Sequence, residues 1–424
     1  MIRKIIIFII FIFAVVLLQT IIKKNETISK RYVNKYLWPY TPVKIQHVLK
    51  VLYDDKYLKK SQNDYNVKFL PKTQLLEVNF TKRKLNFLTE RKDGVYNKNT
   101  VRKSFQIELV EDDRAWLIDN VGIISEIDLN KILNNKKEKI QRKIITSNIK
   151  VHQILDSFIH ENIIYLSFVS LKDKCYRFNI YKAPIAKKKL TFESFFTPKE
   201  CNKTIIQGGR MQHYIHEDQK GLLFTVGDSS SPDFNNDNSQ NLKSIFGKIL
   251  FKDFNDSKDY SIFSIGHRNP QGLYVDNDLI LSTEHGPKSG DEINNIIFEE
   301  NYGWPISSYG ESYFSKGKLS YKKDHSSHGF KEPIFAFLPA IGISELIKIP
   351  DDLTPFWKDN FILSSLNGSS LYRIKFSKKL DKIILYEKLY IGERIRDLKY
   401  SKKFRTIFLA LESEGNLGIF NLKN

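Results

Sequence analysis

The sequence predicts an all-β fold of the sandwich, barrel or propeller class, and three observations lead to it. From about residue 66 onward, short β-branched and aromatic runs alternate with turns rich in Asn, Asp, Gly and Lys. No amphipathic helix longer than about a dozen residues follows the N-terminal apolar run; only single helical turns are expected, at 129–133 and 192–196. Finally, 41% hydrophobic residues in 424 can bury a large core, which excludes disordered, collagen-like and disulfide-stapled small-domain classes.

The N-terminus differs from the rest of the chain. After Arg3 and Lys4, residues 5–22 read IIIFIIFIFAVVLLQTII. As a helix this run spans about 27 Å, enough for the hydrocarbon core of a bilayer. The residues that follow, beginning with Lys23 and Lys24, contain no small-x-small cleavage site. We therefore expect 1–22 to be an uncleaved transmembrane signal anchor. Charge counting leaves its orientation open, because large domains translocate regardless of flanking charges.

Residues 23–65 are expected to form a stalk and lead-in, and residues 66–424 the folded body. Strand-length runs in this body include LLEVNF (75–80), GLLFTVGD (221–228), DLILSTEHG (278–286) and RTIFLALES (405–413). A body of this size is too long for one sandwich and suits six four-stranded blades. However, no repeat of fixed period is visible, so the texture alone does not set the number of blades.

The net charge of +19 comes from 67 Lys+Arg against 48 Asp+Glu. The basic residues are dispersed, and no Gly-aromatic RNA-binding motif accompanies them, which favours a solvated basic surface and no nucleic-acid partner. The two cysteines, Cys175 and Cys201, lack CxxC spacing, which argues against metal or thioredoxin chemistry. A disulfide between them, typical of exported proteins, and two separate thiols both remain open.

Polar residues are densest in 264–305, SIGHRNPQGLYVDNDLILSTEHGPKSGDEINNIIFEENYGWP. Six of them lie at strand ends, where loops on a rigid scaffold present functional groups: His267, Arg268, Asn269, Gln271, Glu284 and His285. Ordinary turn chemistry around one buried Trp is the alternative. Two guanidiniums, those of Arg394 and Arg396, fall on one face of a later strand, where they are either solvated or bind an anionic ligand.

Possible metal sites are few. The adjacent acids Asp291 and Glu292 point to opposite faces of a strand, which argues against a shared-proton pair and favours a hard-cation site over a solvated turn. Segment 233–244 begins like an EF-hand loop but lacks its Gly and its bidentate Glu. The His pairs in HYIH (213–216) and HSSH (325–328) would suit zinc only on a helix, and the first is strand-like. No GxSxG, P-loop or Rossmann motif is present.

Three motifs in order, GHRNPQGL (266–273), EHGPKSGDEIN (284–294) and NYGWP (301–305), resemble the glucose/sorbosone dehydrogenase family. These are soluble aldose sugar dehydrogenases that depend on pyrroloquinoline quinone (PQQ). The similarity covers roughly 66–420 and is strongest from 205 onward. The resemblance implies an all-β six-bladed β-propeller, with PQQ and Ca²⁺ as cofactors and a small sugar or other polyol as substrate; this propeller would follow the N-terminal transmembrane helix expected at 1–22. It also implies a periplasmic or otherwise extracytoplasmic body.

The resemblance assigns roles to individual residues. Arg268 is expected to be catalytic and to face the reactive carbonyls of the quinone, where a cation stabilises charge as hydride arrives. Asn269 and His285 match cofactor-contacting positions. Arg394 and Arg396 match the pair that binds the carboxylates of PQQ.

The same resemblance places two metal regions. The carbonyls of Gly286 and Pro287 match those that hold the Ca²⁺ bridging to PQQ. Glu292 and Tyr302 match a second, structural Ca²⁺ region.

Two positions depart from the family pattern. The His that serves as general base, four residues before the Arg of GGR, is replaced by Ile206, which cannot accept a proton. A Lys that would face the quinone is replaced by Asn367. The nearest histidines, His213 and His216, are expected on the next strand without a route to the pocket. A dehydrogenase-like oxidoreductase with a different base is therefore one interpretation. The other is a non-catalytic propeller that binds an anionic or glycan ligand in its central pocket.

Overall fold

The computed structural model describes residues 76–92, 101–135, 138–228, 238–255, 260–312 and 321–422. The expected anchor (1–22) and stalk (23–65) lie outside these residues. None of the helices in the described residues has the length and apolarity needed to cross a bilayer.

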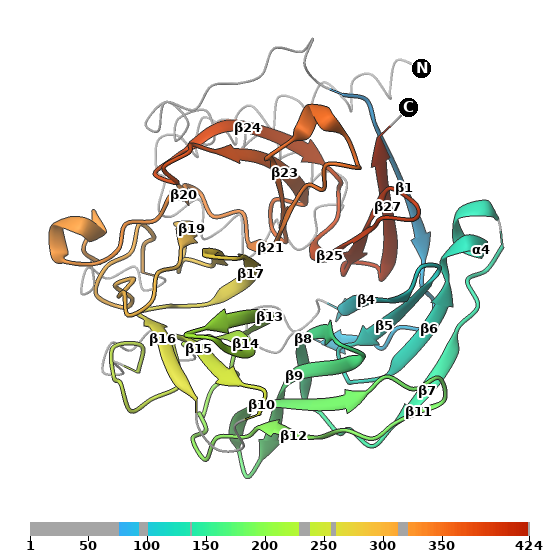
Figure 1. Ribbon diagram of the computed structural model, residues 1–424, viewed down its shortest axis with the longest axis horizontal. Helices are drawn as coiled ribbons and strands as arrows, with labels where there is room; N and C mark the ends of the chain where they lie inside the picture. Colours follow the sequence, from blue (N-terminus) through green and yellow to red (C-terminus); the bar gives the residue numbers. More distant parts are fainter. Residues whose placement is uncertain are drawn as a thin grey trace, which may run out of the picture. The chain divides into compact units, whose positions relative to one another are not determined.

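The described strands form six blades, each an antiparallel sheet of four or five strands with one short parallel addition in the first, around a central channel (Figure 1). Blade one contains β4 (Phe105–Glu111), β5 (Arg114–Asp119), β6 (Ile124–Asp128), β7 (Lys143–Ser147) and β11 (Lys189–Leu190). Blade two contains β8 (Gln153–His160), β9 (Ile163–Lys172), β10 (Cys175–Pro184) and β12 (Glu193–Phe196). Blade three contains β13 (Gly208–His216), β14 (Gln219–Val226), β15 (Lys248–Asp253) and β16 (Ser261–Ile265).

Blade four contains β17 (Pro270–Asp276), β18 (Leu279–Glu284), β19 (Asp291–Asn295) and β20 (Phe335–Phe337). Blade five contains β21 (Ile343–Lys348), β22 (Phe361–Ser365), β23 (Ser370–Phe376) and β24 (Ile383–Tyr390). Blade six contains β25 (Ile395–Ser401), β26 (Thr406–Leu411), β27 (Asn416–Leu422) and β1 (Val78–Lys84). The remaining elements are the hairpin β2 (Arg91–Lys92) and β3 (Val101–Arg102), helix α4 (Leu129–Asn134), and the 3₁₀ turns η4 (His325–His328) and η5 (Pro355–Trp357).

Blade six closes the ring with strands from both ends of the described chain. β1 pairs antiparallel with β27 along its full length, from Val78 opposite Leu422 to Lys84 opposite Asn416. This pairing supplies the fourth strand of blade six from the opposite end of the described chain and so holds the ring of blades together. The all-β, six-bladed prediction is confirmed.

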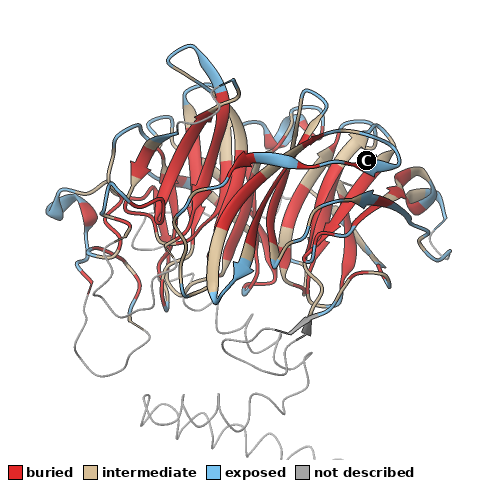
Figure 2. Cartoon of the chain, turned by 90° about the horizontal axis from the view of Figure 1, so that it is seen from below, coloured by how far each residue is buried: buried red, intermediate tan, exposed pale blue. Residues whose placement is uncertain are grey.

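The core lies between neighbouring blades, where the apolar faces of two sheets meet. Blades five and six, for example, share a cluster that includes Ile362, Leu371, Ile395 and Leu409, all with 0% exposure. Figure 2 shows the buried residues along the strands and the exposed ones mainly in the connecting loops. The continuous apolar runs of the sequence are thus strands covered on both faces.

Of the two helical turns expected from the sequence, one is confirmed and one is wrong. Helix α4 begins after Asp128, whose carboxylate accepts the backbone N–H of Lys131 at 3.0 Å. Residues 193–196 instead form strand β12, which pairs with β10. The i, i+3, i+4 spacing of Phe192, Phe195 and Phe196 imitates a helical stripe, but an open edge of β10 supplies backbone partners that a single helical turn would lack.

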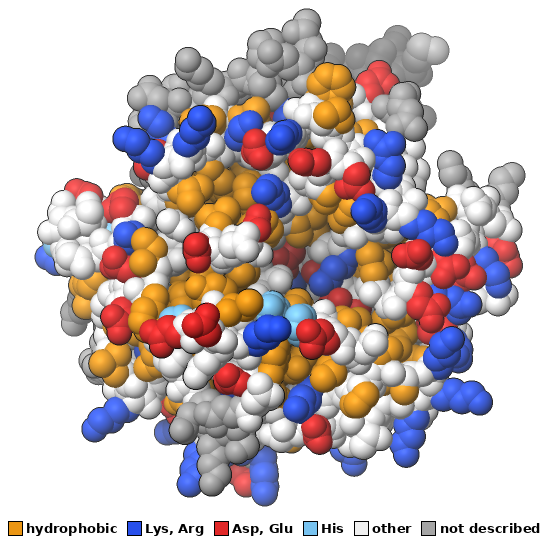
Figure 3. All heavy atoms as spheres, viewed as in Figure 1, with side chains coloured by type: hydrophobic (Ala, Val, Ile, Leu, Met, Phe, Trp, Pro, Cys, Tyr) orange, Lys and Arg blue, Asp and Glu red, His pale blue; other side chains and the backbone are white. Residues whose placement is uncertain are grey.

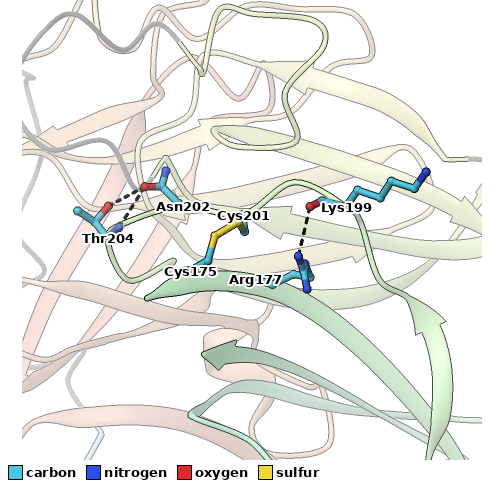
Figure 4. Close-up of a disulfide and its surroundings, with 6 residues drawn as sticks. All are labelled: Cys175, Arg177, Lys199, Cys201, Asn202 and Thr204. Carbon is cyan, nitrogen blue, oxygen red and sulfur yellow. Dashed lines mark hydrogen bonds between the residues drawn. A yellow bond between two sulfur atoms is a disulfide. The ribbon is translucent and has the colours of Figure 1, made fainter. Parts of the chain in front are cut away.

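Cys175 and Cys201 form a disulfide (Figure 4). It joins the start of β10 to the segment after β12, and the next residues on both sides pair as an isolated bridge. Tyr176 N donates to Asn202 O at 2.7 Å, and Asn202 N donates to Tyr176 O at 2.8 Å. The question left open by the sequence is therefore answered in favour of the bonded pair.

Candidate active site

The innermost strands begin at one end of the channel, and most of them begin irregularly. Five of the six, β8, β13, β17, β21 and β25, show a register shift near their first residues against the next strand of the blade. Such bulges turn extra residues out of the regular alternation and re-aim their side chains. The residues within the shifts include Arg210, Gln271, Glu345 and Arg396. Arg210 contacts both Gln271 and Glu345, and Arg396 contacts Gln271, so these contacts join different blades.

Arg268 lies in the link before β17. Its Nη1 donates to the carbonyls of His285 and Gly286 at 2.9 and 2.8 Å, and its guanidinium lies 5.3 Å from the centre of the Trp304 ring. The Trp304 indole N–H in turn donates to Asp228 at 2.6 Å. Arg268 is therefore held between an aromatic face and two backbone oxygens, and among the described residues no carboxylate forms an ion pair with its guanidinium.

Asn269 and His285 form a second group beside Arg268. The amide nitrogen of Asn269 donates to Gln207 Oε1 and lies 3.3 Å from His285 Nδ1, while Asn269 Oδ1 accepts from Gln271 at 2.7 Å. His285 Nε2 lies 2.5 Å from the carbonyl of Ile343. Because that carbonyl can only accept, Nε2 carries the proton and Nδ1 is the acceptor for Asn269.

Arg394 and Arg396 reach one carboxylate from neighbouring positions. Arg394 Nε donates to Glu412 Oε1 at 2.6 Å, and Arg396 Nε donates to Glu412 Oε2 at 2.9 Å. Burial alone would raise the pKa of Glu412, but Arg396, Arg394 and Arg102 outweigh burial and hold the pKa well below its usual range. Arg396 also donates to Gln271 Oε1 at 2.9 Å, which links this group to Asn269.

The three arginines act electrostatically on the same imidazole. Burial lowers the pKa of His285 to about 3, and the positive charges of Arg268, Arg396 and Arg394 add to the shift. The chain thus brings Arg268, Asn269, His285, Arg394 and Arg396 together at the beginning of the inner strands. We call Arg268, Arg394 and Arg396 the cationic cluster. Its geometry suits a ligand with several negative groups.

Backbone oxygens for the first metal are present near Arg268. The carbonyls of His285 and Gly286 converge on one guanidinium nitrogen, so the carbonyl of Gly286, one of the two expected metal ligands, accepts from Arg268. Asp291 stabilises this loop: its carboxylate accepts from Gly286 N at 3.1 Å and from Ile343 N at 3.0 Å. Burial raises the pKa of Asp291 to about 6, against these hydrogen bonds. The Ca²⁺ site expected at the carbonyls of Gly286 and Pro287 stays a prediction, and a cation bound there would compete with Arg268 for the Gly286 carbonyl.

The second expected metal region also contains unsatisfied oxygens. Glu292 faces away from Asp291, as the strand geometry predicts, and its Oε1 lies 3.5 Å from His325 Nε2. Burial, and then the neighbouring charge of Glu284, raise the pKa of Glu292 well above its usual range. Within the described residues, Asn294 Oδ1 and Ser282 Oγ are buried without a hydrogen-bond partner. Buried oxygens without partners beside the Glu292 carboxylate fit a cation.

Tyr302 takes a different place in that region. Its hydroxyl donates to Asn295 O at 2.6 Å and accepts from Ile297 N at 2.9 Å, and its carbonyl lies 3.2 Å from His325 Nδ1. Across the described ranges, no group of three or more His, Cys, Asp or Glu side chains is arranged to hold a metal ion. Any cation would depend on carbonyl and amide oxygens as much as on carboxylates.

The two residues that depart from the family pattern, Ile206 and Asn367, are both placed by the structure. Ile206 has 0% exposure and packs in an apolar cluster that includes Phe178 and Phe246. Asn367 lies in the turn between β22 and β23, against Gly342. His213 and His216 belong to β13 itself, the strand of Arg210, which corrects the expectation that they lie on the next strand.

The two histidines on β13 point away from a common ligand. His213 stacks on His160 with ring centres 4.2 Å apart, and His216 packs on Phe298 at 4.6 Å. The HSSH pair occupies turn η4, where only His325 is buried. As expected for residues three positions apart on a strand, His213 and His216 therefore face different surroundings.

Further along the channel the innermost strands assemble a second charged group. Arg210 Nη1 lies 2.8 Å from Asp156, 2.6 Å from Glu345 and 3.2 Å from Asp397. Beside them, Lys399 lies 3.1 Å from Glu108. We call these six residues the hub cluster. Arg210 also donates to the carbonyls of Gln271 and Arg396, at 2.7 and 2.8 Å, and so joins the hub cluster to the residues of the candidate site.

The hub cluster carries four carboxylates and two cations. Burial raises the pKa of Glu108 and Glu345 to about 7 and that of Asp156 to about 6, although Lys399 or Arg210 opposes each shift. A cavity of about 130 Å³ beside it is lined in part by Ser157, Gln212 and Lys399. Figure 3 shows the face of the propeller hollowed at its centre, with charged side chains of both signs there and dispersed over the rest of the surface.

The sequence did not single out Gln207, Arg210 or Glu412. The sequence does contain a sign of Glu412, because this acid directly follows the apolar run 407–411. A charged side chain at such a position is buried only if it is paired. Gln207 and Arg210 gave none, because their importance depends on partners more than fifty positions away.

The chain is thus a six-bladed propeller with the cationic cluster at one end of its channel. The glucose/sorbosone dehydrogenase family model matches residues 147–418, more than half of the chain. The chain belongs to this family. It is 31% identical to aldose sugar dehydrogenase YliI of Escherichia coli over 163 residues, 37% of this chain and 42% of that protein. The chain spans about half or less of the length of the curated relatives it matches.

Solved structures share the fold. The crystal structure of the soluble aldose sugar dehydrogenase from Escherichia coli in the apo form matches with a TM-score of 0.64 and 18% identity, covering 82% of this chain and 100% of that one. The PQQ-bound aldose sugar dehydrogenase from Streptomyces coelicolor matches with a TM-score of 0.54 and 17% identity, covering 82% and 100%.

Proposed function

We propose that this protein is a PQQ- and Ca²⁺-dependent oxidoreductase that acts on a small sugar or other polyol. The observation that carries the proposal is the convergence of Arg268, Arg394 and Arg396 around Asn269 and His285, in a chain of the glucose/sorbosone dehydrogenase family. Bound PQQ would supply a two-electron acceptor for hydride. A relative solved with PQQ supports this assignment.

Each residue of the site has a chemical task that follows from its contacts. Arg394 and Arg396 would bind carboxylates of the cofactor by guanidinium forks that Glu412 orients. Arg268, held by Trp304 and two carbonyls, would place a fixed positive charge where negative charge develops. Asn269 has its amide fixed by Gln207 and Gln271, so it would present a preset hydrogen bond.

The proton acceptor for the substrate hydroxyl is the part of the machinery that differs. Ile206 stands where the family pattern has a base, and its apolar packing offers no proton acceptor. His285 is a weak substitute, because its pKa near 3 leaves little affinity for a proton at neutral pH. We expect slow sugar oxidation, on the order of 10²- to 10⁴-fold below that of a variant with a well-placed base.

The test uses the purified full-length chain in detergent with PQQ and Ca²⁺ added. We expect the absorbance of a bound quinone, slow dye reduction with at least one aldose, and faster reduction for Ile206→His. A matched control is Ile245→His, which places a histidine in the same buried cluster. Thermal melting and PQQ binding of both variants separate lost folding from lost chemistry.

The outcomes distinguish the two interpretations of the chain. PQQ binding without turnover, and without gain in Ile206→His, would favour a non-catalytic propeller that binds an anionic or glycan ligand. Failure to bind PQQ at any Ca²⁺ concentration would refute the cofactor assignment.

We further propose that residues 1–22 anchor the protein in a membrane with the propeller on the extracytoplasmic, for example periplasmic, side. The Cys175–Cys201 disulfide supports an oxidising compartment. Protease digestion of cells, intact, with a permeabilised outer membrane, or fully lysed, tests this location. Cleavage of the propeller only after lysis of the inner membrane would contradict it.

A further inference from the structure

A buried chain of three side chains lies directly behind Arg268. Ser264 Oγ is 2.8 Å from His267 Nε2, and His267 Nδ1 is 3.0 Å from Glu284 Oε2. The other oxygen of Glu284 accepts the backbone N–H of Arg268. Ser264 belongs to β16 and Glu284 ends β18, so the chain ties blade three to blade four at the point where Arg268 enters the site.

The order Ser, His, Glu is that of a hydrolase triad, but the surroundings exclude that use. Ser264 and His267 have 0% exposure and Glu284 has 4%. The ring of Tyr302 covers the imidazole, with ring centres 4.6 Å apart. A nucleophile must reach its substrate, and no substrate reaches Ser264.

The hydrogen bonds of this chain have a fixed direction. A carboxylate can only accept, so His267 Nδ1 carries a proton and donates it to Glu284. In the neutral ring, Nε2 is then an acceptor for the hydroxyl of Ser264. Glu284 thus receives two donors from consecutive residues, the ring of His267 and the peptide N–H of Arg268. A carboxylate that holds both fixes the backbone at the base of the Arg268 side chain.

We propose that Glu284, oriented by His267 and Ser264, is the positioning residue that sets the guanidinium of Arg268 over Trp304 and against the carbonyls of residues 285 and 286. That Arg268 then contacts a quinone rests on the proposed function; the restraint on Arg268 itself does not. Because small misplacements of a charged group lose much of its effect on a reacting centre, this restraint matters for rate as well as for fold.

The experiment follows Trp304 as a reporter of Arg268. Full-length protein is labelled with 5-fluorotryptophan, and the ¹⁹F resonance of Trp304 is assigned with Trp304→Phe. Arg268→Ala gives the position of that resonance without the guanidinium. We expect Glu284→Gln to move the Trp304 resonance toward the Arg268→Ala position and to weaken PQQ binding about tenfold.

Glu284→Gln also carries a second signature. Its amide oxygen can still accept from Arg268 N–H, but its NH₂ then faces His267 Nδ1 and forces the ring proton to Nε2. Nitrogen-15 shifts of His267 report this tautomer change, which a merely structural loss would not produce. The matched control is Glu387→Gln, which breaks the 2.5 Å pair with Arg373 in blade five and should leave Trp304 and His267 unchanged.

Should Glu284→Gln fail to fold, Ser264→Ala serves in its place. It removes only the hydroxyl at the far end of the Ser264–His267–Glu284 chain and should shift the Trp304 resonance less, in the same direction. A Trp304 resonance in Glu284→Gln that coincides with the wild type would overturn the proposal, even if PQQ binding were weakened. If wild-type protein binds no PQQ, the proposed function fails, while the Trp304 and His267 signals still decide the role of Glu284.

Discussion

Two layers of the same channel use the same kinds of residue with opposite results. In the layer at the strand starts, Glu412 is buried between Arg394 and Arg396, and its pKa is lowered. In the hub cluster, Glu108 and Glu345 are also buried, yet their pKa values rise to about 7. Burial pushes every carboxylate pKa upward, so the ratio of cations to carboxylates decides the final sign. In the first layer the arginines outnumber Glu412, whereas in the hub cluster four carboxylates share two cations.

The largest effect is expected for Arg210→Met. Three carboxylates, those of Asp156, Glu345 and Asp397, would lose their shared cation inside the protein. Leaving buried charges unpaired costs about 3–5 kcal/mol, which urea unfolding followed by circular dichroism measures. The matched control is Lys348→Met, which breaks an exposed pair with Asp276 and should cost under about 1 kcal/mol. Equal small losses for both variants would show that the hub carboxylates are protonated rather than paired.

The pH dependence of the hub cluster is the next largest effect. The folded pKa of Glu345, about 7, exceeds its ordinary value of 4.5, so its contribution is fully present below about pH 4.5 and is lost as the pH rises to 7. We expect wild type to lose roughly 1–3 kcal/mol of stability over this window relative to Glu345→Gln. Stability curves at half-unit pH steps provide the measurement. Parallel curves for the two proteins would contradict the shifted titration.

Glu412→Gln should show the opposite pH dependence. The folded pKa of Glu412 is lowered, so its contribution is present above the unfolded pKa and disappears as the pH falls through the folded value. The variant should be less stable than wild type by roughly 2 kcal/mol at pH 7, with the gap narrowing below pH 4.5. A gap that widens on acidification would remove the contrast between the two layers.

Conservative changes in the cationic cluster should have the smallest effect. Arg396→Lys keeps the charge but loses the planar fork that binds Glu412 and Gln271. We expect the affinity for PQQ, measured by titration calorimetry at fixed Ca²⁺, to fall about tenfold while stability changes by under about 1 kcal/mol. Arg405→Lys, on the loop side of blade six, serves as control. Unchanged affinity in Arg396→Lys would show that only charge matters there.

Much of the fold follows from local patterns in the sequence. The strand runs with intervening turns predict an all-β body, because the side-chain patterns of strands are local. The order of GHRNPQGL, EHGPKSGDEIN and NYGWP indicates the family and the group around Arg268. The helical turn predicted at 192–196 is wrong. The spacing of Phe192, Phe195 and Phe196 fits a helix, but pairing with strand β10 makes residues 193–196 a strand.

The pairing of charges belongs to the tertiary structure. Glu412 receives Arg394 and Arg396 only because β25 and β26 are neighbours, and Arg210 meets Glu345 and Asp397 only because the ring of blades closes. At the bulges that start the inner strands, different blades send different residues, among them Arg210, Gln271 and Glu345, to the centre from corresponding positions. The amino-acid order thus specifies local strands and motifs. Which buried charges gather as an excess of cations and which neutralise one another depends on long-range contacts that no local pattern encodes.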